Sequence, residues 1–335
     1  MSEIESDAAP RARVGVRDVA RVAGVSAQTV SRVINDHTSI RPETRARVLE
    51  AMERLGYRVN NAARALGTRT TRTVGVIASD ATLYGPSVGI SALETAARSA
   101  GRWIATAYAE AADAASVVGA AERLLSQGVD GLIVLAPHAA TMPALATAYA
   151  GLPIDALHTD VGADRQAEGA ALAVDHLVAL GHRRIGRVAG PQDWLEARSR
   201  DEGVDHALRS AGLGEGPRWS GDWSAAAGAA LAGEIAAAVR GADGPTAIVV
   251  ANDQMALGLV SALRAAGVAV PEDVSVAGFD DNPDAAFYLP ALTTVRLDLA
   301  GEARRAVAAV FGMPDPPAPS SPQLIARAST AAPRG

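Results

Sequence analysis

The chain has 335 residues, of which 49% are hydrophobic, so it is long enough to form two or three domains with sizeable cores. It contains no cysteine, which excludes disulfides, thiolate metal sites and a cysteine nucleophile. The net charge is −6, but residues 11–72 contain thirteen arginines and only five acids, about +8, which leaves about −14 for the rest. A basic N-terminal region on an acidic body favours a polyanionic partner there, although a solvated helical surface would have the same charges.

The first ten residues are acidic and polar, and they contain no apolar run of the kind that a secretory signal needs. Residues 1–13 are therefore expected to form a disordered tail. No stretch of the sequence is long and apolar enough to cross a bilayer. These features favour a cytoplasmic protein with no membrane partner.

Residues 14–58 have the pattern of three short helices. The first is predicted over Val16–Ala23 and ends at Gly24, which suits a tight turn. The second begins after Ser26, a good N-cap, and runs to Ile34, and the third begins at Pro42. The positions expected to face inward are Val19, Ala20, Ala23, Val30, Val33, Ile34, Val48, Leu49, Met52 and Leu55. Two short helices joined by a glycine turn form a helix-turn-helix unit, which places the start of its second helix in the DNA major groove.

Three runs of this region resemble the DNA-binding head of the LacI/GalR family of bacterial repressors: Val16–Asn35, Pro42–Val48 and Leu55–Asn60. The resemblance implies that Ala27, Gln28 and Arg32 lie where bases are read. Gln28 can donate and accept at a base edge, Arg32 can bind guanine in a bidentate manner, and Ala27 offers only a methyl contact. The alternative is that Gln28 and Arg32 are solvated helix residues. The other expected contacts, mainly to phosphates, are Arg17, Ser26, Thr29, Ser31, Asn35, Tyr57 and the arginines of the third helix.

Residues 59–71 are expected to form a hinge helix and a linker. The run Asn60–Leu66 is too short for a stable isolated helix, because helix nucleation is costly. In the family this segment folds on DNA and inserts a leucine into the minor groove, so the resemblance assigns Asn60, Ala63 and Leu66 to the DNA contact. The alternative is a flexible linker in which Leu66 has no special role.

From residue 72 to about residue 332, short apolar runs alternate with helical stretches, which is typical of α/β domains with parallel sheets. The predicted strands are Val74–Ala78, Trp103–Ala107, Gly131–Leu135, Ile154–Leu157, Arg184–Ala189, Ala247–Val250 and Val274–Ala277. The predicted helices are Ser87–Ala100, Asp113–Gln127, a helix from about residue 165 to Leu180, Leu195–Ala211, Ser224–Val239 and Gln254–Ala266. The resemblance implies a ligand-binding domain of two lobes like that of periplasmic binding proteins. The lobes are expected at residues 72–164 with 299–320, and at residues 165–297 with 321–330.

The loops at the carboxyl ends of these strands are rich in polar and aromatic residues, a mixture that suits a sugar. Asp280, Asn252 and Arg200 supply planar donors and acceptors, and Trp223 supplies an aromatic face. By position alone, Asp280 or Asn252 is equally well explained as a helix cap. The ligand-binding residues that the resemblance implies are Ser79, Leu83, Gly85, Asp160, Trp194, Arg200, Trp223, Asn252 and Asp280.

Two of the implied positions leave alternatives open, and one expected polar contact is missing. The chain is several residues shorter than the family pattern between Pro153 and Gly169, so the expected aspartate is Asp160 or Asp155. Trp194 can contact the ligand or act as a hydrophobic plug. Leu297 stands where a sugar-facing glutamine is expected, so one polar contact is missing.

Catalytic constellations are absent from the sequence. There is no P-loop, no G-x-G-x-x-G and no H-E-x-x-H motif, and the six histidines do not cluster at metal-ligand spacing. The pair Asp280–Asp281 suggests acid–base chemistry, but it serves hydrogen bonding to a sugar equally well. We therefore expect no catalytic residue, no metal and no cofactor. An exported sugar-binding protein would have the same lobes, but it would need a secretory signal and no basic head.

The resemblance implies a homodimer that binds a pseudo-palindromic DNA operator with two heads and two hinge helices. Residues 313–335 lack leucine heptads, so no tetramerising coiled coil is expected. A small sugar, a galactoside or a related glycoside, is expected to bind between the lobes, change their relative orientation and release the DNA. The alternative is a regulator whose corepressor, such as a purine, promotes DNA binding.

Overall fold

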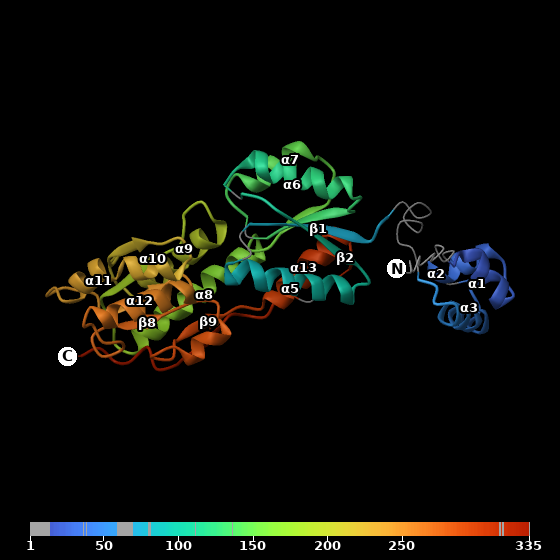
Figure 1. Ribbon diagram of the computed structural model, residues 1–335. Coiled ribbons are helices and arrows are strands. Elements are labelled where there is room, and N and C mark those ends of the chain that lie inside the picture. The colour runs from blue at the N-terminus through green and yellow to red at the C-terminus, as the bar shows by residue number, and fades with distance from the viewer. Residues whose placement is uncertain are drawn as a thin grey trace, which may run out of the picture. The chain divides into compact units, whose positions relative to one another are not determined.

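The structure is a computed structural model that describes residues 14–35, 37, 39–58, 70–79, 82–110, 112–135, 137–314, 316 and 318–334 (Figure 1). The chain divides into two compact units, residues 1–71 and residues 72–335, which we call the head and the body. The expected tail over residues 1–13 and most of the expected hinge, residues 59–69, lie outside the described residues.

The described part of the head contains three helices: α1 (Val16–Ala23), α2 (Ala27–Ile34) and α3 (Pro42–Arg54). Gly24 ends α1 with a φ of 65°, a left-handed conformation that glycine adopts without a steric cost. The Oγ atom of Ser26 accepts a hydrogen bond from the backbone N–H of Thr29 at 3.1 Å, so the predicted N-cap of α2 is confirmed. The buried residues of the head are Val19, Ala20, Ala23, Val30, Val33, Val48 and Ala51.

One predicted core position of the head is wrong. Leu49 is 51% exposed, whereas Ala51 is buried. The inward face of α3 passes through Val48, Ala51, Met52 and Leu55, which have the i, i+3, i+4 and i+7 spacing of one helix face. Leu49 follows Val48 directly and is therefore rotated by roughly 100° away from the core.

The first lobe of the body contains a parallel sheet with the strand order β2-β1-β3-β4. Its strands are β1 (Thr73–Ala78), β2 (Trp103–Tyr108), β3 (Gly131–Val134) and β4 (Ile154–Ala156). Helices α6 (Ala114–Ser126) and α7 (Thr141–Ala148) cover one face, and α5 (Tyr84–Ser99) and α13 (Leu299–Phe311) cover the other (Figure 1). The central strands read as continuous apolar runs because helices bury the sheet on both sides.

The second lobe repeats this architecture with the strand order β6-β5-β7-β8. Its strands are β5 (Ile185–Ala189), β6 (Arg218–Ser220), β7 (Ala247–Val250) and β8 (Ser275–Ala277). Helices α8 (Val161–Ala179) and α9 (Leu195–Ser210) pack on one face of the sheet. Helices α11 (Ala232–Val239) and α12 (Asp253–Ala265) pack on the other, and α10 (Ala225–Ala230) packs against α12. The lobe also contains the 3-10 helix Pro283–Phe287 and the antiparallel pair β9 (Thr294–Arg296) and β10 (Gln323–Ile325).

The predicted α/β class with parallel sheets and N-terminal helices is confirmed. The predicted helix Ser224–Val239 is interrupted at Leu231, which ends α10 and precedes α11. The hydrophobic pattern does not predict α7, α13 or the three-residue strands β6, β9 and β10. Each of these strands is too short to show a periodicity of its own.

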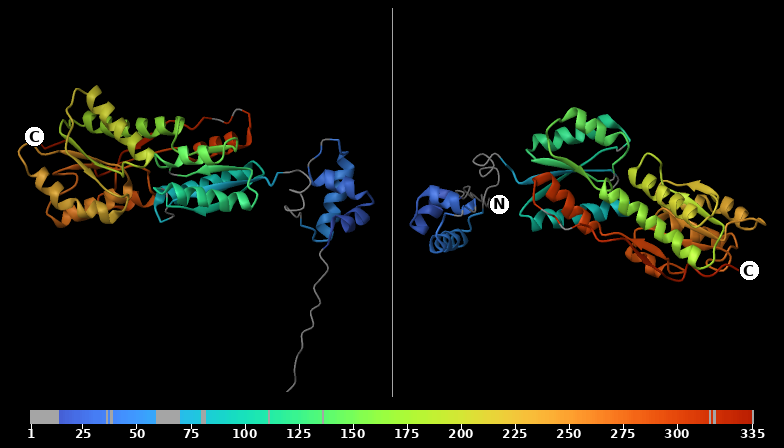
Figure 2. Two further views of the ribbon diagram at one scale, coloured as in Figure 1. Left: turned by 90° about the horizontal axis from the view of Figure 1, so that it is seen from above. Right: turned by 180° about the vertical axis from the view of Figure 1, so that it is seen from behind.

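Within the described residues of the body, the chain crosses from one lobe to the other three times. The crossings lie between β4 and α8, between β9 and α13, and between α13 and β10. Figure 2 shows α8, in yellow-green, extending into the second lobe, and α13, in red, within the first. Such multiple connections allow two lobes to change orientation about a common hinge. Among the described residues, no helix is both long and apolar enough to span a membrane.

Candidate functional site

A cavity lies between the two lobes, at the carboxyl ends of both parallel sheets. Segments that follow β1, β4, β5, β6, β7 and β8 contribute to its lining, as the topology of parallel sheets predicts. It holds about 590 Å³ of space, part of which is open to solvent. The lining residues are Leu83, Gly85, Pro86, His158, Gln166, Trp194, Glu196, Arg200, Trp223, Asn252, Gln254, Asp280, Leu297 and Leu299.

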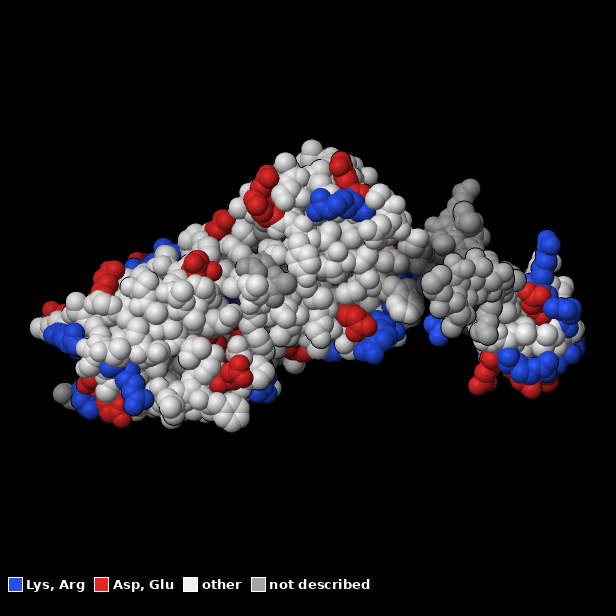
Figure 3. All heavy atoms as spheres, viewed as in Figure 1, with Lys and Arg blue, Asp and Glu red and all other residues white. Residues whose placement is uncertain are grey.

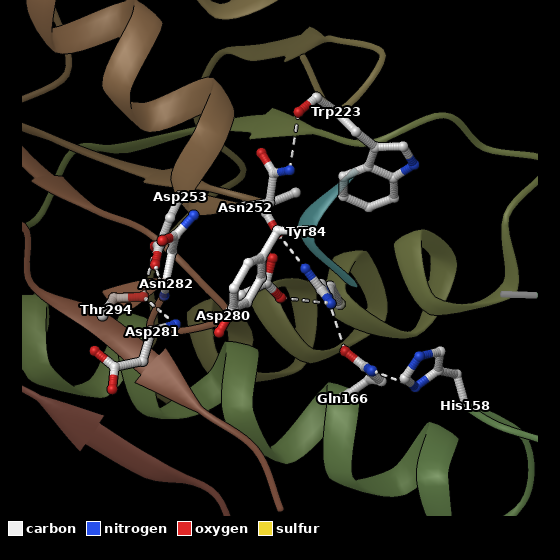
Figure 4. A network of polar contacts seen from close by, with 12 residues as sticks. Tyr84, His158, Gln166, Trp223, Asn252, Asp253, Asp280, Asp281, Asn282 and Thr294 are labelled. Atoms are coloured by element: carbon white, nitrogen blue, oxygen red, sulfur yellow. Dashed lines mark hydrogen bonds and ion pairs between the residues drawn. The ribbon is translucent and has the colours of Figure 1, made fainter. Parts of the chain in front are cut away.

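Arg200, on α9, contacts several polar groups on one side of the cavity. Its Nε atom donates to Oε1 of Gln166 at 2.7 Å, its Nη1 atom donates to the carbonyl oxygen of Ala251, and its Nη2 atom lies 3.1 Å from Oδ1 of Asp280 (Figure 4). The guanidinium carbon lies 3.9 Å from the centre of the Phe279 ring. Because hydrogen bonds and a stacked ring fix the group from several directions, the guanidinium is held in one orientation.

Three lining residues have left-handed backbone conformations, with φ of 63° at His158, 77° at Trp223 and 107° at Asp280. Residues other than glycine rarely adopt such angles, and each one stores strain of about 1–3 kcal/mol. The surrounding fold therefore imposes these conformations, and all three side chains line the cavity. Burial raises the pKa of Asp280, and the nearby Arg200 guanidinium opposes this shift without cancelling it.

A second charged pair is buried beside the first. Nδ1 of His158 lies 3.4 Å from Oε2 of Glu302, and the backbone N–H of His158 donates to Oε1 of the same carboxylate. Burial alone would lower the pKa of His158, but the charge of Glu302 outweighs it and raises this pKa. Burial alone would raise the pKa of Glu302, but His158 outweighs it and lowers this pKa. Gln166 lies between the two pairs: its Oε1 accepts from Nε of Arg200, and its Nε2 lies 2.9 Å from Nδ1 of His158 (Figure 4).

Two tryptophans form an aromatic wall of the cavity. The ring centres of Trp194 and Trp223 lie 5.7 Å apart in an edge-to-face arrangement. A Cβ atom at Gly190 would come within 2.3 Å of the Trp223 ring, so this packing requires glycine there. The Trp194 ring also lies 4.7 Å from the ring of His138, whose Nδ1 is 3.0 Å from Oδ2 of Asp193. Trp194 therefore belongs both to the cavity wall and to a contact between the lobes.

Asn252 caps a helix and also lines the cavity. Its Oδ1 accepts from the backbone N–H of Met255 at 2.9 Å, which caps α12, and its Nδ2 donates to the carbonyl oxygen of Trp223 at 2.9 Å. The helix-cap explanation is therefore confirmed, and the contact of Asn252 with a ligand stays a prediction.

Asp253, the next residue, is buried behind the cavity wall. Its carboxyl group accepts from Oγ1 of Thr294 at 2.6 Å and from the backbone N–H of Asn282 at 2.8 Å (Figure 4). Burial, reinforced by the charge of Asp280, raises the pKa of Asp253 to about 8. A protonated Asp253 at neutral pH avoids placing two buried negative charges next to each other.

The structure places seven of the nine predicted ligand residues in the cavity lining: Leu83, Gly85, Trp194, Arg200, Trp223, Asn252 and Asp280. Leu297 also lines the cavity, so the position expected to lack a polar contact is apolar in the structure. Ser79 is not part of the lining, and its Oγ atom is buried without a hydrogen-bond partner among the described residues.

Asp160 requires a correction. It is exposed at the start of α8 and does not line the cavity, and the alternative, Asp155, forms an ion pair with Arg305 at 3.0 Å. His158 points inward instead, because the backbone turns sharply after β4, with positive φ at His158 and at Asp160. Sequence reasoning also missed Gln166, Glu196 and Gln254. The position of His158 after a predicted strand was the available signal for that residue.

The head presents a polar edge of α2 to solvent. Ala27, Gln28, Ser31 and Arg32 are exposed on one side of this helix, while Val30 and Val33 on the other side are buried. Arg17 and Ser26 are exposed too, and Thr29, Asn35 and Tyr57 are half-buried. Figure 3 shows several arginines on the visible face of the head, with acidic side chains between them. The remaining predicted DNA contacts, Asn60, Ala63 and Leu66, lie outside the described residues.

Comparisons with known proteins match both units. The family described as "Bacterial regulatory proteins, lacI family" matches residues 15–60, and the "Periplasmic binding protein-like domain" matches residues 174–331. The lactose operon repressor of Escherichia coli (strain K12) is 36% identical over 293 residues, which cover 85% of this chain and 80% of that protein. The HTH-type transcriptional repressor PurR of Pasteurella multocida (strain Pm70) is 33% identical over 306 residues, covering 88% and 90%. A crystal structure of the lac repressor dimer bound to operator and the anti-inducer ONPF matches with a TM-score of 0.79 and 32% identity, covering 96% of this chain and all of that one.

Proposed function

The chain belongs to the lacI family of bacterial regulatory proteins and is a transcriptional repressor, and we propose that a small sugar, a galactoside or a related glycoside, releases it from its DNA operator. The cavity between the lobes carries this proposal. It combines fixed planar donors and acceptors, on Arg200, Asn252 and Asp280, with the rings of Trp194 and Trp223. Sugars need both, because their hydroxyl groups pair with planar polar groups and their C–H faces pack on aromatic rings.

The exposed edge of α2 supports the DNA-binding part of the proposal. In a helix-turn-helix unit the N-terminal residues of the second helix contact base edges in the major groove. Gln28 and Arg32 are one turn apart on that edge, so both side chains reach the same groove. Ser31 and the arginines of α3 are expected to bind phosphates and to set the register.

A homodimer is part of the proposal, since the lac repressor in the matching crystal structure is a dimer bound to operator. The second lobe exposes apolar side chains in one region, with Phe287 83% and Leu289 75% exposed. Leu289 and Val260 line a common hollow, and Leu257 lies one turn before Val260 on α12. Exposed apolar surface of this kind is typical of protein–protein interfaces.

Replacing Leu289 with aspartate is expected to shift the protein from dimer to monomer. A charge at the centre of an apolar interface must be desolvated, so the dimer dissociation constant should rise about 100-fold or more. Sedimentation equilibrium measures this constant, and circular dichroism checks that the variant stays folded. Met313→Asp, at another exposed apolar position, is the control. A folded Leu289→Asp variant that dimerises like the control would place the interface elsewhere.

Contacts across the cleft supply the coupling between sugar and DNA. The backbone N–H of Tyr84 in the first lobe donates to Oε1 of Gln254 in the second at 3.0 Å, and His138 pairs with Asp193 across the same cleft. A sugar that touches both lobes stabilises one of their relative orientations and disfavours the other. To release DNA it must bind the released state better, and such couplings are typically about 1–3 kcal/mol.

The test of the proposed function is a titration of operator binding against galactosides, glucosides and pentoses at fixed salt. Fluorescence anisotropy of a labelled operator duplex reports the DNA affinity, and the fluorescence of the cavity tryptophans reports sugar binding. One class of sugar is expected to weaken operator binding by about 5- to 150-fold. If no sugar changes it while a purine base strengthens it, the protein is a corepressor-dependent regulator and the sugar proposal is overturned.

A further inference from the structure

Glu196 is a carboxylate that the network around the cavity leaves unused. It lies in the first turn of α9, lines the cavity and is only 6% exposed. Its Oε2 atom is buried and has no hydrogen-bond partner in the described part of the chain. Buried carboxylate oxygens normally have partners, because an unpaired one costs most of its hydration free energy.

The charges that surround Glu196 are already matched with one another. Arg200 pairs with Asp280 at 3.1 Å, and His158 pairs with Glu302 at 3.4 Å. Each cation of these two pairs therefore has its own carboxylate, and among the described residues that line the cavity Glu196 is the acidic residue outside these pairs. The position of Glu196 near the N-terminus of α9 offsets part of the cost, because the helix dipole favours negative charge there.

A free donor lies in the same wall. Nε1 of Trp223 is buried and has no hydrogen-bond partner among the described residues, although an indole N–H can only donate. Two residues of the cavity lining thus carry a buried polar atom that lacks a partner, an acceptor on Glu196 and a donor on Trp223. A hydroxyl group can both donate and accept a hydrogen bond, so a ligand rich in hydroxyl groups suits both kinds of atom.

We propose that Glu196 is a specificity-determining residue, which accepts hydrogen bonds from hydroxyl groups of a neutral sugar and excludes sugars that carry a carboxylate or a phosphate. This inference rests on the proposed sugar-binding function and names the class of sugar. An anionic sugar would bring a second negative charge to a buried carboxylate, and like charges in a desolvated site repel strongly. A neutral sugar instead gives Oε2 the donor that it lacks.

The experiment compares neutral methyl glycosides of galactose, glucose and mannose with the corresponding methyl uronides, which differ by a carboxylate at C6. Binding is measured by calorimetry on the full chain and on Glu196→Gln. Glu202→Gln is the matched control, because Glu202 is an exposed carboxylate on the same helix. Thermal unfolding of all three proteins shows whether the substitutions disturb the fold.

Wild type and Glu202→Gln are expected to bind at least one neutral glycoside and to bind its uronide at least about 10-fold more weakly. Glu196→Gln should bind the neutral glycoside about 10- to 100-fold more weakly, since hydrogen bonds to charged groups are the stronger ones. This variant should also lose most of the preference for the neutral glycoside over the uronide. If Glu196→Gln binds both sugars as the control does, Glu196 does not determine specificity and sugar binding stands without it. If wild type binds no sugar of either kind, this inference and the proposed function both fail.

Discussion

Replacing Arg200 with lysine is expected to abolish the release of operator DNA by sugar while leaving operator binding intact. Lysine keeps the charge but has one nitrogen in place of the three that reach Gln166, Ala251 and Asp280, and it loses the stacking on the Phe279 ring. The bidentate hydrogen bonding of a guanidinium to a sugar would also be lost. The sugar concentration at half-maximal release should therefore rise about 100-fold or more in anisotropy titrations of the labelled operator.

Arg198→Lys provides the control for this variant, because Arg198 is exposed on the same helix and lies outside the cavity lining. It should respond to sugar like the wild type. Sugar binding to Arg200→Lys is measured separately through tryptophan fluorescence, which distinguishes lost binding from lost coupling. If the variant no longer binds operator, Arg200 is needed for folding. If sugar releases the variant from operator as it releases the wild type, Arg200 is not part of the sugar site.

The secondary structure could be predicted where a single hydrophobic pattern identifies an element. The central strands of both sheets are buried on two faces, so they read as apolar runs such as Val74–Ala78, and the structure confirms them. Leu49 shows the limit of this reasoning, because apolar character alone does not say which of two adjacent helical positions faces the core. The strand β6 is missed because its three residues pair with β5 only through tertiary structure.

The cavity could be predicted in part for a related reason. Parallel strands end at one edge of a sheet, so polar residues after predicted strands, such as Asn252 and Asp280, are expected to meet there. The pair of His158 and Glu302 could not be found in this way, because its partners are 144 residues apart and neither belongs to a local motif. Glu196 was missed because an acid in the first turn of a helix is usually explained by the helix dipole.

Replacing Arg32 with alanine is expected to lower the affinity of the repressor for its operator by about 30-fold or more. Each bidentate contact of an arginine with guanine contributes about 1–3 kcal/mol, and a dimer would lose two of them. Arg32 is exposed on α2, and the core of the head is formed by Val30 and Val33 on the other side of the helix, so the variant should stay folded. Gel-shift or anisotropy titrations at constant salt measure the change.

The ratio of the affinity for operator to the affinity for random-sequence DNA distinguishes base recognition by Arg32 from a purely electrostatic contact. Arg54→Ala, at an exposed position near the end of α3, removes the same charge from the head without touching α2. Arg32→Ala should lose affinity for operator much more than for random-sequence DNA, whereas Arg54→Ala should weaken both slightly and equally, because phosphate contacts are independent of sequence. If Arg32→Ala also weakened both equally, Arg32 would be a phosphate contact, and base reading on α2 would rest on Gln28 and its neighbours.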